Sequence, residues 1–400
     1  MAEGALSGVR VLELAQMVTG PFCGKLLADL GAQVTKIEPP TGDPARRYGP
    51  FPGDIPHPEK SGLFLYLNTS KRSVTLDLEK PPGRKLFQGL LGEADVLILD
   101  HQPRERKRLG LEYEELLEIN PRLIATAVTP FGQTGPHRDY RTYHLNRYQA
   151  GGDGYLIMAG PGYLDRPPLQ APCFLGDYQA GLGAAIATLG ALYFRNLSGQ
   201  GQEVDCSEQE WCLNLNAIYI GKYPNDGFEV NRAKLDYATG GIMECQDGYI
   251  MLMLLEDHHW DRLVQVMGSP PWAREERFKT QYSRTQHREE VNGRVSQFLK
   301  QHTKEELRRL CYDAGVPLGP VASPQEVMAS EQAQARGLFG EIDHPQAGRF
   351  LYPLAPARFS RTSWRPGRAP LLGEHNQEIY CSRLGYTPQE LVRLRGLGVI

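Results

Sequence analysis

The sequence has no excess of either charge, no long apolar run and no paired cysteines. Its 44 basic and 47 acidic residues give a net charge of -3, which excludes the broad positive field of a protein that wraps nucleic acid. No segment reaches the roughly 20 apolar residues that a membrane-spanning helix requires. The start, MAEGALSGVRVLELA, lacks a basic region followed by an apolar one. We therefore expect a soluble protein without a targeting signal.

The seven cysteines are an odd number, scattered along the chain without a C-x-x-C pair. This pattern argues against a disulfide framework and against a zinc site, so we predict a cytoplasmic protein with no metal. With 400 residues, of which 41% are hydrophobic, the chain can bury a large core. We expect it to divide into two structural units.

Strand-like and helix-like segments alternate through the first half of the chain. Residues 9–15 have the pattern of a buried strand, residues 20–31 that of a helix bounded by glycines, and residues 32–38 that of a second strand. The alternation continues to a strand and helix within residues 199–220. It predicts an α/β fold with a doubly wound parallel sheet.

A second unit is expected to begin at Gly240. The passage before it, about 222–238, is rich in Tyr and Asn and is predicted to be a linker. The segment from Gly240 should form a hairpin around Asp247-Gly248, followed by helices to about Ala314. The tail after that point is predicted to return to strand and loop.

Two familiar nucleotide-binding loops are absent after the first strand. TGPFCGKL (19–26) has three residues between its glycines where a Walker loop has four, and Leu26 replaces the Ser/Thr magnesium ligand. Leu14 to Gly20 lacks the G-x-G-x-x-G pattern of dinucleotide-binding loops, although Glu38 ends the second strand where a ribose-binding acid could lie. A nucleotide triphosphatase is excluded, and an NAD-dependent oxidoreductase is a weakly supported alternative.

The segment EDHHWD (256–261) gathers possible metal ligands. However, adjacent His258 and His259 would point in different directions on a helix, and no i, i+4 histidine pair is present. We favour a helix start rich in acidic and aromatic residues.

Two basic stretches, SKRS (70–73) and RERKRLG (104–110), lie beside predicted strands. Most charge runs are solvated surface. Open α/β sheets nevertheless bind ligands at strand ends, so a phosphate-bearing cofactor is the alternative interpretation.

Asp177 follows Gly176 at the expected start of a helix poor in large side chains, residues 174–192. Taken alone, an aspartate in this place is an N-cap, which is its commoner role. A helix N-terminus also favours negative charge, and an ionised, rigid carboxylate can act as a nucleophile. The small residues that follow should let the helix pack closely and leave space near its start.

Segments along nearly the whole chain resemble the class III coenzyme A transferases, which include formyl-CoA transferase, carnitine CoA-transferase and α-methylacyl-CoA racemase. The similar segments, in family order, are LSGVRVLELAQMVTGPFCGKLLADLGAQVTKIEPPTGDPARR, NTSKRSVTLDL, FGQTGP, LGDYQAGLGAAIATLGAL, SGQGQEVD, AGVPLGPV and RAPLLGEHNQEI. The resemblance implies a large Rossmann-like domain formed by residues 1–221 and 326–400 and a small α/β domain formed by residues 222–325. It also implies an interlocked homodimer.

The resemblance further implies that Asp177 is the catalytic nucleophile. It would attack the thioester carbonyl of an acyl-CoA to give an aspartyl anhydride, and the returning CoA thiolate would form an aspartyl-CoA thioester. CoA would then pass to a second carboxylic acid, so CoA is a co-substrate and no tightly bound cofactor is expected. The sequence does not identify the donor or the acceptor acid.

By the same resemblance, Lys71 and Arg108 contact the phosphates of CoA, and the main chain of Met17 lies beside the pantetheine arm. The two basic stretches add Arg72 and Arg104 as further candidates for phosphate contacts.

Several positions differ from the formyl-CoA transferases. Val18 replaces a glutamine, His144 replaces a tyrosine, and the glycine-rich loop of the small domain is reduced to Thr239 followed by Gly240-Gly241. Oxalate is therefore a poor candidate substrate. Asp100-His101 replaces the usual Asn-Phe, which leaves the adenine contacts open.

The racemase branch is the alternative within the family. Racemases share the aspartate and use a histidine and a glutamate for proton transfer. Glu256 falls near that glutamate, but Tyr143 stands at the histidine position, with His144 next to it, and a tyrosine is a poor base near neutral pH. We predict CoA transfer. A catalytically silent CoA-binding subunit stays open as an alternative from another class.

Overall fold

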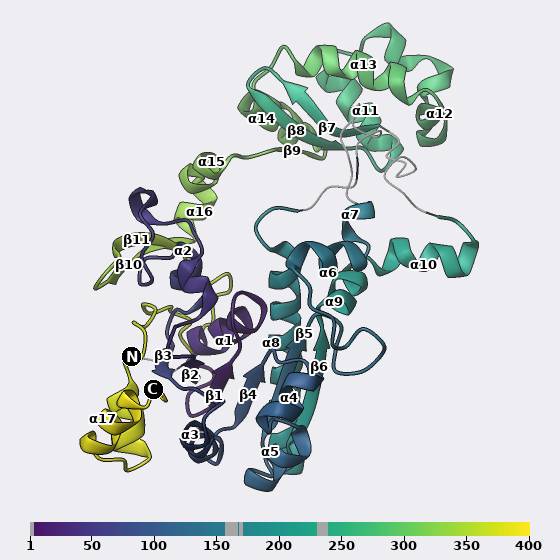
Figure 1. Ribbon diagram of the computed structural model, residues 1–400. Coiled ribbons are helices and arrows are strands. Elements are labelled where there is room, and N and C mark those ends of the chain that lie inside the picture. Colours follow the sequence, from purple (N-terminus) through teal and green to yellow (C-terminus); the bar gives the residue numbers. More distant parts are fainter. Residues whose placement is uncertain (1–3, 157–166, 168–170, 230–238) are drawn as a thin grey trace. The chain divides into compact units, whose positions relative to one another are not determined.

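The computed structural model of the chain divides into two compact units and describes residues 4–156, 167, 171–229 and 239–400 (Figure 1). The first unit consists of Met1–Gly154, Gln170–Ile220 and Gln334–Ile400. The second consists of Tyr155–Leu169 and Gly221–Ala333.

A six-stranded parallel sheet forms the centre of the first unit, in the order β3-β2-β1-β4-β5-β6. The chain moves outward from β1 to β3 and then crosses back to β4, on the other side of β1. Open sheets of this order bind ligands beyond the carboxyl ends of the strands, near that reversal. The strands are β1 (Arg10–Leu14), β2 (Gln33–Glu38), β3 (Arg72–Thr75), β4 (Val96–Leu99), β5 (Ile124–Thr129) and β6 (Gln202–Ser207).

Helices and one hairpin complete the first unit, with α7, α10 and α16 crossing its boundary. These elements are α1 (Thr19–Asp29), η1 (Pro44–Arg47), η2 (Pro52–Asp54), α2 (Gly62–Leu67), α3 (Pro81–Leu91), α4 (Pro103–Leu109), α5 (Tyr113–Ile119), α6 (His144–Ala150), α7 (Asp153–Leu156), α8 (Leu175–Ser198), α9 (Glu208–Leu215), α10 (Ala217–Asp226), α16 (Glu331–Ala335), β10 (Phe339–His344), β11 (Gly348–Pro353), η5 (Gln377–Arg383) and α17 (Pro388–Gly396). None of the helices within the described residues is long and apolar enough to cross a bilayer.

Local sequence signals account for many of these bounds. The uniformly apolar β4 is buried along its whole length, as expected for a strand covered on both faces. Pro81 opens α3, where its missing N–H has no helical partner to lose. Gly199 ends α8 in the left-handed conformation, with φ of 77°, which glycine adopts without strain.

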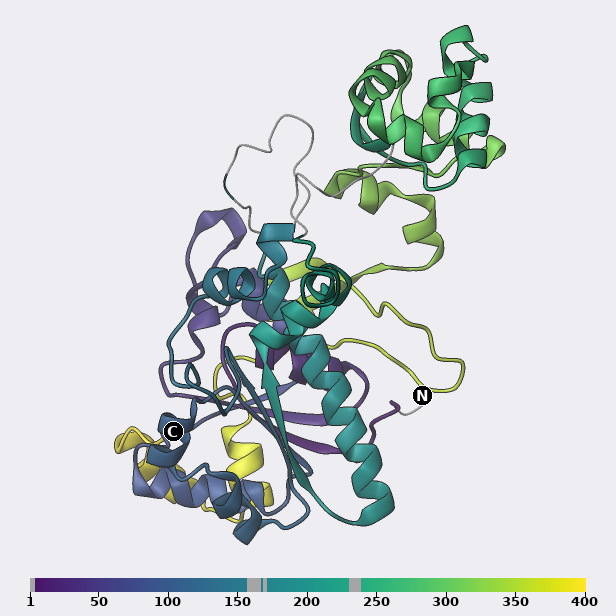
Figure 2. The ribbon, with the colours of Figure 1, turned by 90° about the vertical axis from the view of Figure 1, so that its right-hand side faces the viewer.

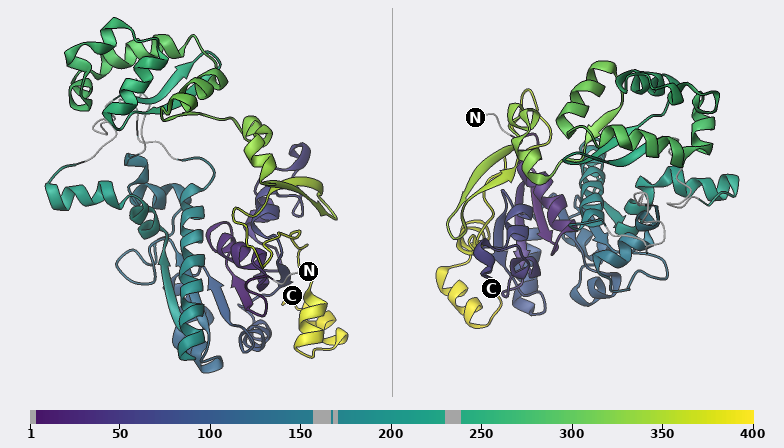
Figure 3. Two further views of the ribbon diagram at one scale, coloured as in Figure 1. Left: turned by 180° about the vertical axis from the view of Figure 1, so that it is seen from behind. Right: turned by 90° about the horizontal axis from the view of Figure 1, so that it is seen from above.

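Helices cover both faces of the sheet, because neighbouring residues of a strand point to opposite sides. Val11 of β1 packs with Leu27 of α1 and Ala184 of α8. Leu12 points the other way and joins a cluster with Phe87 of α3, α5 and the C-terminal helix η5. Seen from behind, α1 and α8 lie in front of the strands (Figure 3), and Figure 2 shows the long α8 beside β6. The predicted doubly wound sheet is confirmed.

The contact between α1 and α8 depends on small residues. A Cβ atom added at Gly181 would lie 2.6 Å from the carbonyl oxygen of Thr19 and 3.2 Å from Cβ of Phe22. On another side of α8, a Cβ atom at Gly183 would lie 2.2 Å from the ring of Trp211 on α9. These distances confirm that the small residues of α8 allow close packing, and this packing brings the start of α8 beside the start of α1.

The second unit is built on a three-stranded antiparallel sheet in the order β7-β8-β9. The predicted β7–β8 hairpin is confirmed, with its turn at Gln246-Asp247, one residue before the expected centre, and with Gly248 paired to Cys245. Trp260 and Phe278 centre a buried cluster beneath the sheet. The elements of this unit are β7 (Gly240–Cys245), β8 (Gly248–Met253), α11 (Asp257–Val266), η3 (Pro271–Arg274), η4 (Glu276–Phe278), α12 (Gln281–Gln286), α13 (Arg288–Leu299), α14 (Lys304–Ala314), β9 (Leu318–Pro320) and α15 (Pro324–Ala329).

Two predictions for local structure were wrong. The expected linker at 222–238 begins inside α10, which continues to Asp226 despite Pro224. A proline near a helix end removes only one hydrogen bond, so it need not stop the helix there; residues 230–238 lie outside the described residues. The tail also contains helices as well as strand and loop. The capping box of Thr387 and Glu390 starts α17 and could have been seen in the sequence.

Candidate active site

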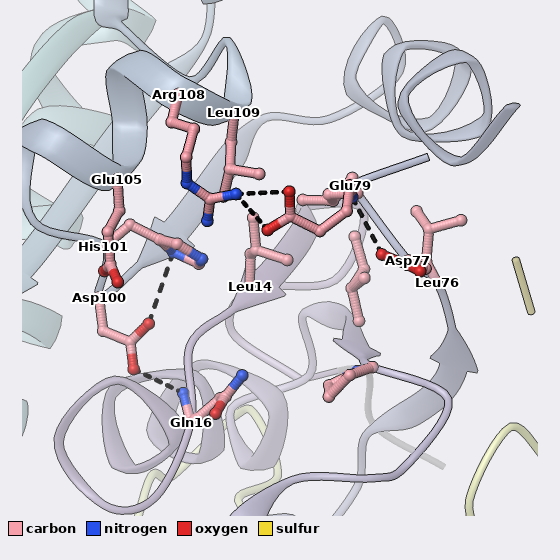
Figure 4. A pocket seen from close by; sticks show the side chains of 13 residues that line it. Leu14, Gln16, Leu76, Asp77, Glu79, Asp100, His101, Glu105, Arg108 and Leu109 are labelled. Carbon is pink, nitrogen blue, oxygen red and sulfur yellow. Dashed lines mark hydrogen bonds and ion pairs between the residues drawn. The ribbon is translucent and has the colours of Figure 1, made fainter. Parts of the chain in front are cut away.

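Two adjoining cavities lie in the first unit, beyond the carboxyl ends of the strands. The larger, of about 960 Å³, is bounded by the β1–α1 loop, α6 and the starts of α8 and α9. The smaller, of about 360 Å³, lies among the ends of β1, β2, β3 and β4 and includes one face of α4 (Figure 4). Gln16, Asp100 and Glu105 line both cavities.

Asp177 lies at the inner wall of the larger cavity, with only 2% of its surface exposed. The prediction that it caps α8 was wrong. The helix begins at Leu175, after Phe174 in the left-handed conformation, so Asp177 is the third helical residue and forms no cap hydrogen bond. The carboxylate is thus free of backbone capping and faces α1 and α6, while its position in the first turn still favours negative charge.

The carboxylate of Asp177 belongs to a cluster of polar side chains from four helices. Nη2 of Arg147, on α6, forms an ion pair with Oδ1 of Asp177, and Nε of Arg147 forms another with Oε2 of Glu208, the first residue of α9. The hydroxyl of Thr19, on α1, donates to Oε1 of Glu208 at 2.5 Å and lies 3.4 Å from Oδ1 of Asp177. One guanidinium therefore serves two carboxylates.

Burial raises the pKa of Glu208 above its ordinary range, against the opposing effects of Arg147 and Thr19. Neither Arg147 nor Glu208 was predicted from the sequence. Arg147 lies near the candidate His144 and Glu208 follows the helix-capping Ser207, but only the packing of α6 and α9 against α8 brings them to Asp177.

The rest of the larger cavity is mostly apolar and aromatic. Val18 is buried at the start of α1, and the ring of His144 lies tilted over that of Phe174, with centroids 4.7 Å apart. Burial and the charge of Arg147 lower the pKa of His144. Tyr143 is 82% exposed at the start of α6, so it borders the solvent side of the cavity.

Lys71 lies away from both cavities. Its side chain is buried, and Nζ lies 2.7 Å from Oε2 of Glu13, 2.8 Å from the carbonyl oxygen of Pro21 and 2.9 Å from Oδ1 of Asn68. The ammonium group donates hydrogen bonds to Pro21 and Asn68 and forms an ion pair with Glu13. Burial lowers the pKa of Lys71 to about 8. Because Lys71 lines neither cavity and is held by Glu13, Pro21 and Asn68, we propose a structural role for it in place of the expected phosphate contact.

The other basic candidates are on the surface. Arg72 begins β3, at the amino end of the strand, and lies 3.4 Å from Glu378. Arg104 is exposed on α4 and does not line either cavity. Arg108, also on α4, lines the smaller cavity and forms an ion pair with Glu79 (Figure 4). Of these three arginines, Arg108 alone lies on a cavity wall.

The loop between β1 and α1 connects the two cavities. Met17 has φ of 59° and its N–H donates to Oδ1 of Asp43 at 3.1 Å, while the N–H of Gln16 donates to Oδ2 of Asp100 at 2.8 Å (Figure 4). Two carboxylates thus hold a backbone conformation that is unusual for a non-glycine residue. The loop places Met17 on the wall of the larger cavity.

Asp100 and His101, at the end of β4, stand where the cavities adjoin. Burial, with a smaller contribution from Asp43, raises the pKa of Asp100 to about 7. Its carboxylate lies 3.6 Å from Nδ1 of His101, and burial lowers the pKa of that histidine. The site therefore contains a carboxyl group that titrates near neutral pH.

Comparison with known proteins identifies the family. Residues 6–376 match the family described as CoA-transferase family III. The chain belongs to this family. It is 34% identical to succinyl-CoA–D-citramalate CoA-transferase of Chloroflexus aurantiacus, over 99% of this chain and 98% of that protein. It is 31% identical to formyl-CoA:oxalate CoA-transferase of Rhodopseudomonas palustris, over 99% of this chain and 97% of that protein.

Solved structures agree with this assignment. A CaiB/BaiF family protein from Brucella suis has a TM-score of 0.83 and 31% identity, covering 95% of this chain and 99% of that one. A protein of Mycobacterium tuberculosis has a TM-score of 0.81 and 28% identity, covering 94% of this chain and 99% of that one. The chain is a class III CoA-transferase, with CoA as its co-substrate.

Glu38 was the one residue that supported an NAD-dependent oxidoreductase, and the structure removes that support. Glu38 is 1% exposed and accepts from Arg46 at 2.7 and 2.9 Å and from Ser73 at 2.6 Å. A carboxylate used in this way is not available to a ribose. Among the described residues, no group of three or more His, Cys, Asp or Glu side chains could hold a metal ion.

The remaining candidates lie in the second unit of the transferase. Gly240 and Gly241 begin β7, with φ of 112° and 103°, and the N–H of Gly240 donates to Asn292. Glu256 precedes α11 and lies 3.1 Å from Nδ1 of His258. The segment EDHHWD is a helix start, as predicted.

Proposed function

We propose that this class III CoA-transferase moves CoA from an acyl-CoA to a free carboxylic acid through covalent intermediates on Asp177. The observation that carries the proposal is a buried carboxylate at the wall of a cavity of about 960 Å³, on the first turn of α8. A rigid carboxylate shielded from bulk water is suited to nucleophilic attack, and the shielding protects a reactive anhydride from hydrolysis.

The chemistry proceeds in two exchanges at Asp177. A carboxylate oxygen attacks the thioester carbonyl, a C–O bond forms, and CoA leaves as the thiolate with the electron pair of the C–S bond. The thiolate then attacks the carbonyl carbon of Asp177 and releases the first acid. The second acid reverses both steps. The first N–H groups of α8, which no side chain caps, are suited to stabilise the oxyanions.

We place the adenosine and phosphate portion of CoA in the smaller cavity and the pantetheine arm along the β1–α1 loop. This position lies at the reversal between β1 and β4, where open α/β sheets bind ligands. Arg108 is the phosphate contact on this wall, once it exchanges Glu79 for the phosphate. Asp100 and Glu105 mark the route between the cavities.

The walls favour an acid with an apolar body. The named relatives act on succinyl-CoA with D-citramalate and on formyl-CoA with oxalate. Here Val18, Tyr48 and Phe174 line the larger cavity. Burying a hydrocarbon group against such a wall is favourable, whereas burying a second carboxylate there is costly. We therefore propose a monocarboxylic acid with an aliphatic or aromatic body and not oxalate.

We further propose that two chains form a homodimer through α8 and the helices after it. Several large apolar side chains on this part of the first unit are exposed, with fractions from 40% to 79%. They are Leu182, Ile186, Tyr193, Leu197, Leu213, Leu215 and Ile218. Apolar surface of this kind is typical of a subunit interface. Sedimentation velocity measures the assembly directly.

The proposal predicts the behaviour of Asp177→Asn. An amide cannot form the anhydride, so turnover should fall by several orders of magnitude while CoA binding persists. Digests of the wild-type enzyme incubated with a panel of acyl-CoA thioesters should contain CoA attached to the peptide carrying Asp177, detected by mass spectrometry. Asp139→Asn, a surface aspartate outside both cavities, is the matched control.

Two results would contradict this function. Turnover of the Asp177→Asn enzyme within tenfold of wild type would remove Asp177 from the mechanism. Rapid uptake of deuterium at the α-carbon of a 2-methylacyl-CoA in deuterium oxide, without an acceptor acid and lost in His144→Ala, would indicate a racemase instead.

A further inference from the structure

The ion pair between Arg147 and Asp177 raises a chemical problem for the resting enzyme. Arg147 pairs with Oδ1 of Asp177, an oxygen of the carboxylate that has to attack the thioester. Its side chain is only 17% exposed, and its other contact is Glu208, which is 4% exposed. A largely buried guanidinium needs anionic partners, because an unpaired charge there is strongly unfavourable.

The covalent cycle removes one of those partners. When Asp177 becomes a thioester, its carbonyl group is neutral, and Arg147 keeps only Glu208. This step rests on the proposed function of Asp177. The next anion to enter the larger cavity is the carboxylate of the acceptor acid. Nη2 of Arg147 then has a vacant hydrogen-bonding direction at the site of the next reaction.

We propose that Arg147 is the binding residue for the free acid and that it exchanges its partner between Asp177 and the carboxylate of the acid during each turnover. Glu208 holds Nε throughout and so keeps the guanidinium directed at Asp177. Thr19 in turn fixes Glu208 from α1 at 2.5 Å. Among the described residues that line the larger cavity, Arg141 is the other arginine, and its side chain is 89% exposed and directed to Glu105.

The bonds made and broken balance without any further reactant. One oxygen of the bound carboxylate attacks the carbonyl carbon of the Asp177 thioester, the C–O bond of the anhydride forms, and the thiolate leaves with the electron pair of the C–S bond. The thiolate then attacks the carbonyl carbon of the acid, and the bond to Asp177 breaks. Asp177 recovers its carboxylate and returns to Arg147. No proton is transferred in either step.

The exchange predicts that Arg147 affects the two substrates unequally. In the resting enzyme Asp177 occupies Arg147, so acyl-CoA binds without using the guanidinium. The acid binds to the enzyme in which Asp177 carries CoA as a thioester, and its binding depends on the guanidinium of Arg147. Arg147→Gln should raise the KM of the acid by at least about 30-fold, as is usual when one partner of a buried charge pair is removed, and change the KM of acyl-CoA by less than threefold.

Steady-state kinetics with both substrates varied measure these constants, using the acyl-CoA and acid that give the fastest turnover in a panel of apolar carboxylic acids. Arg138→Gln is the matched control, since Arg138 pairs with Asp139 and lines neither cavity. The double variant Arg147→Gln with Glu208→Gln removes both charges and guards against misfolding caused by an unpaired Glu208. Arg147→Ala assayed with added methylguanidinium should recover part of the affinity for the acid.

The outcomes separate this proposal from the function of Asp177. Absence of CoA on Asp177 in the wild-type enzyme contradicts the covalent mechanism, whatever the variants do. With CoA on Asp177 established, a rise of less than threefold in the KM of the acid in the folded single and double variants overturns the role of Arg147. An equal rise in the KM of acyl-CoA overturns it as well, because it would show a general distortion of the cavity.

Discussion

Replacing Lys71 by methionine separates a structural role of this lysine from a role in CoA binding. Methionine keeps much of the length of the side chain but removes the charge, the ion pair with Glu13 and the hydrogen bonds to Pro21 and Asn68. The other oxygen of Glu13 keeps its contact with Lys36 at 3.0 Å. Removing one partner of a buried ion pair costs about 3–5 kcal/mol.

That loss is a large part of the stability of a typical domain, which is about 5–15 kcal/mol. At roughly 2–4 °C per kcal/mol for a unit of this size, the Tm of the first unit should fall by about 6–20 °C. CoA affinity measured well below that temperature should not change, because Lys71 lines neither cavity. Thermal unfolding followed by circular dichroism and titration calorimetry with CoA supply the two measurements.

Arg108→Met should behave in the opposite way. Its side chain is 54% exposed and its ion pair is with an exposed Glu79, so the Tm should hardly move. The Kd for CoA should rise about tenfold at low ionic strength and by less as salt is added, because an exposed contact with a phosphate is screened.

The reasoning is refuted if Lys71→Met weakens CoA binding tenfold and leaves the Tm within 2 °C of wild type. Lys71 would then be the phosphate ligand that the family resemblance implies. The double variant Lys71→Met with Glu13→Gln is the control for burial: it removes the carboxylate left by Lys71, and Lys36 keeps its contact with Asp43 at 2.8 Å, so part of the lost Tm should return.

Two other predictions concern the cavity walls. Burial raises the pKa of Asp100 to about 7, so this group is neutral below pH 7 and repels the anionic CoA above it. The Kd for CoA should therefore rise from pH 6 to pH 8, and Asp100→Asn should show a smaller rise; equal slopes by calorimetry would contradict this. Gly181→Val places Cβ 2.6 Å from the carbonyl oxygen of Thr19, so it should cost about 1–3 kcal/mol and lower kcat by displacing α1 from α8. Gly293→Val, at a position with open space around it, should change neither the Tm nor kcat appreciably.

The sheet could be predicted because its signal is local. Parallel strands covered on both faces consist of apolar runs such as Val96–Leu99, and the helices between them begin and end at Pro and Gly. The basic stretches carry no comparable signal. Lys71 and Arg72 are neighbours in sequence, yet one is buried against Glu13 and the other is only half-buried. Lys71 is buried because its partner Glu13, which is distant in the sequence, is itself buried.

The candidate site could be predicted only in part, because most of its contacts join residues that are distant in the sequence. Asp177 was identified from its segment and from the family resemblance, but its supposed cap geometry was wrong, because the helix starts two residues earlier than Asp177. Arg147 and Glu208 escaped notice because each looks like an ordinary helical residue. The packing of α6 and α9 against α8 brings Arg147 and Glu208 beside Asp177, and the spacing of these residues in the sequence does not predict that packing.

The charges around Asp177 suggest which state of the enzyme the cavity suits best. In the resting state two carboxylates, Asp177 and Glu208, share one guanidinium, and burial raises the pKa of Glu208. In the proposed covalent cycle, converting Asp177 to a thioester leaves one carboxylate with one guanidinium, a neutral pair. In a cavity of low polarity the balanced arrangement is favoured over an excess of negative charge. In that cycle, the excess of negative charge promotes the attack of Asp177 on acyl-CoA. An entering acid that pairs with Arg147 restores the excess, which favours its attack on the Asp177 thioester and the passage of CoA to the acid.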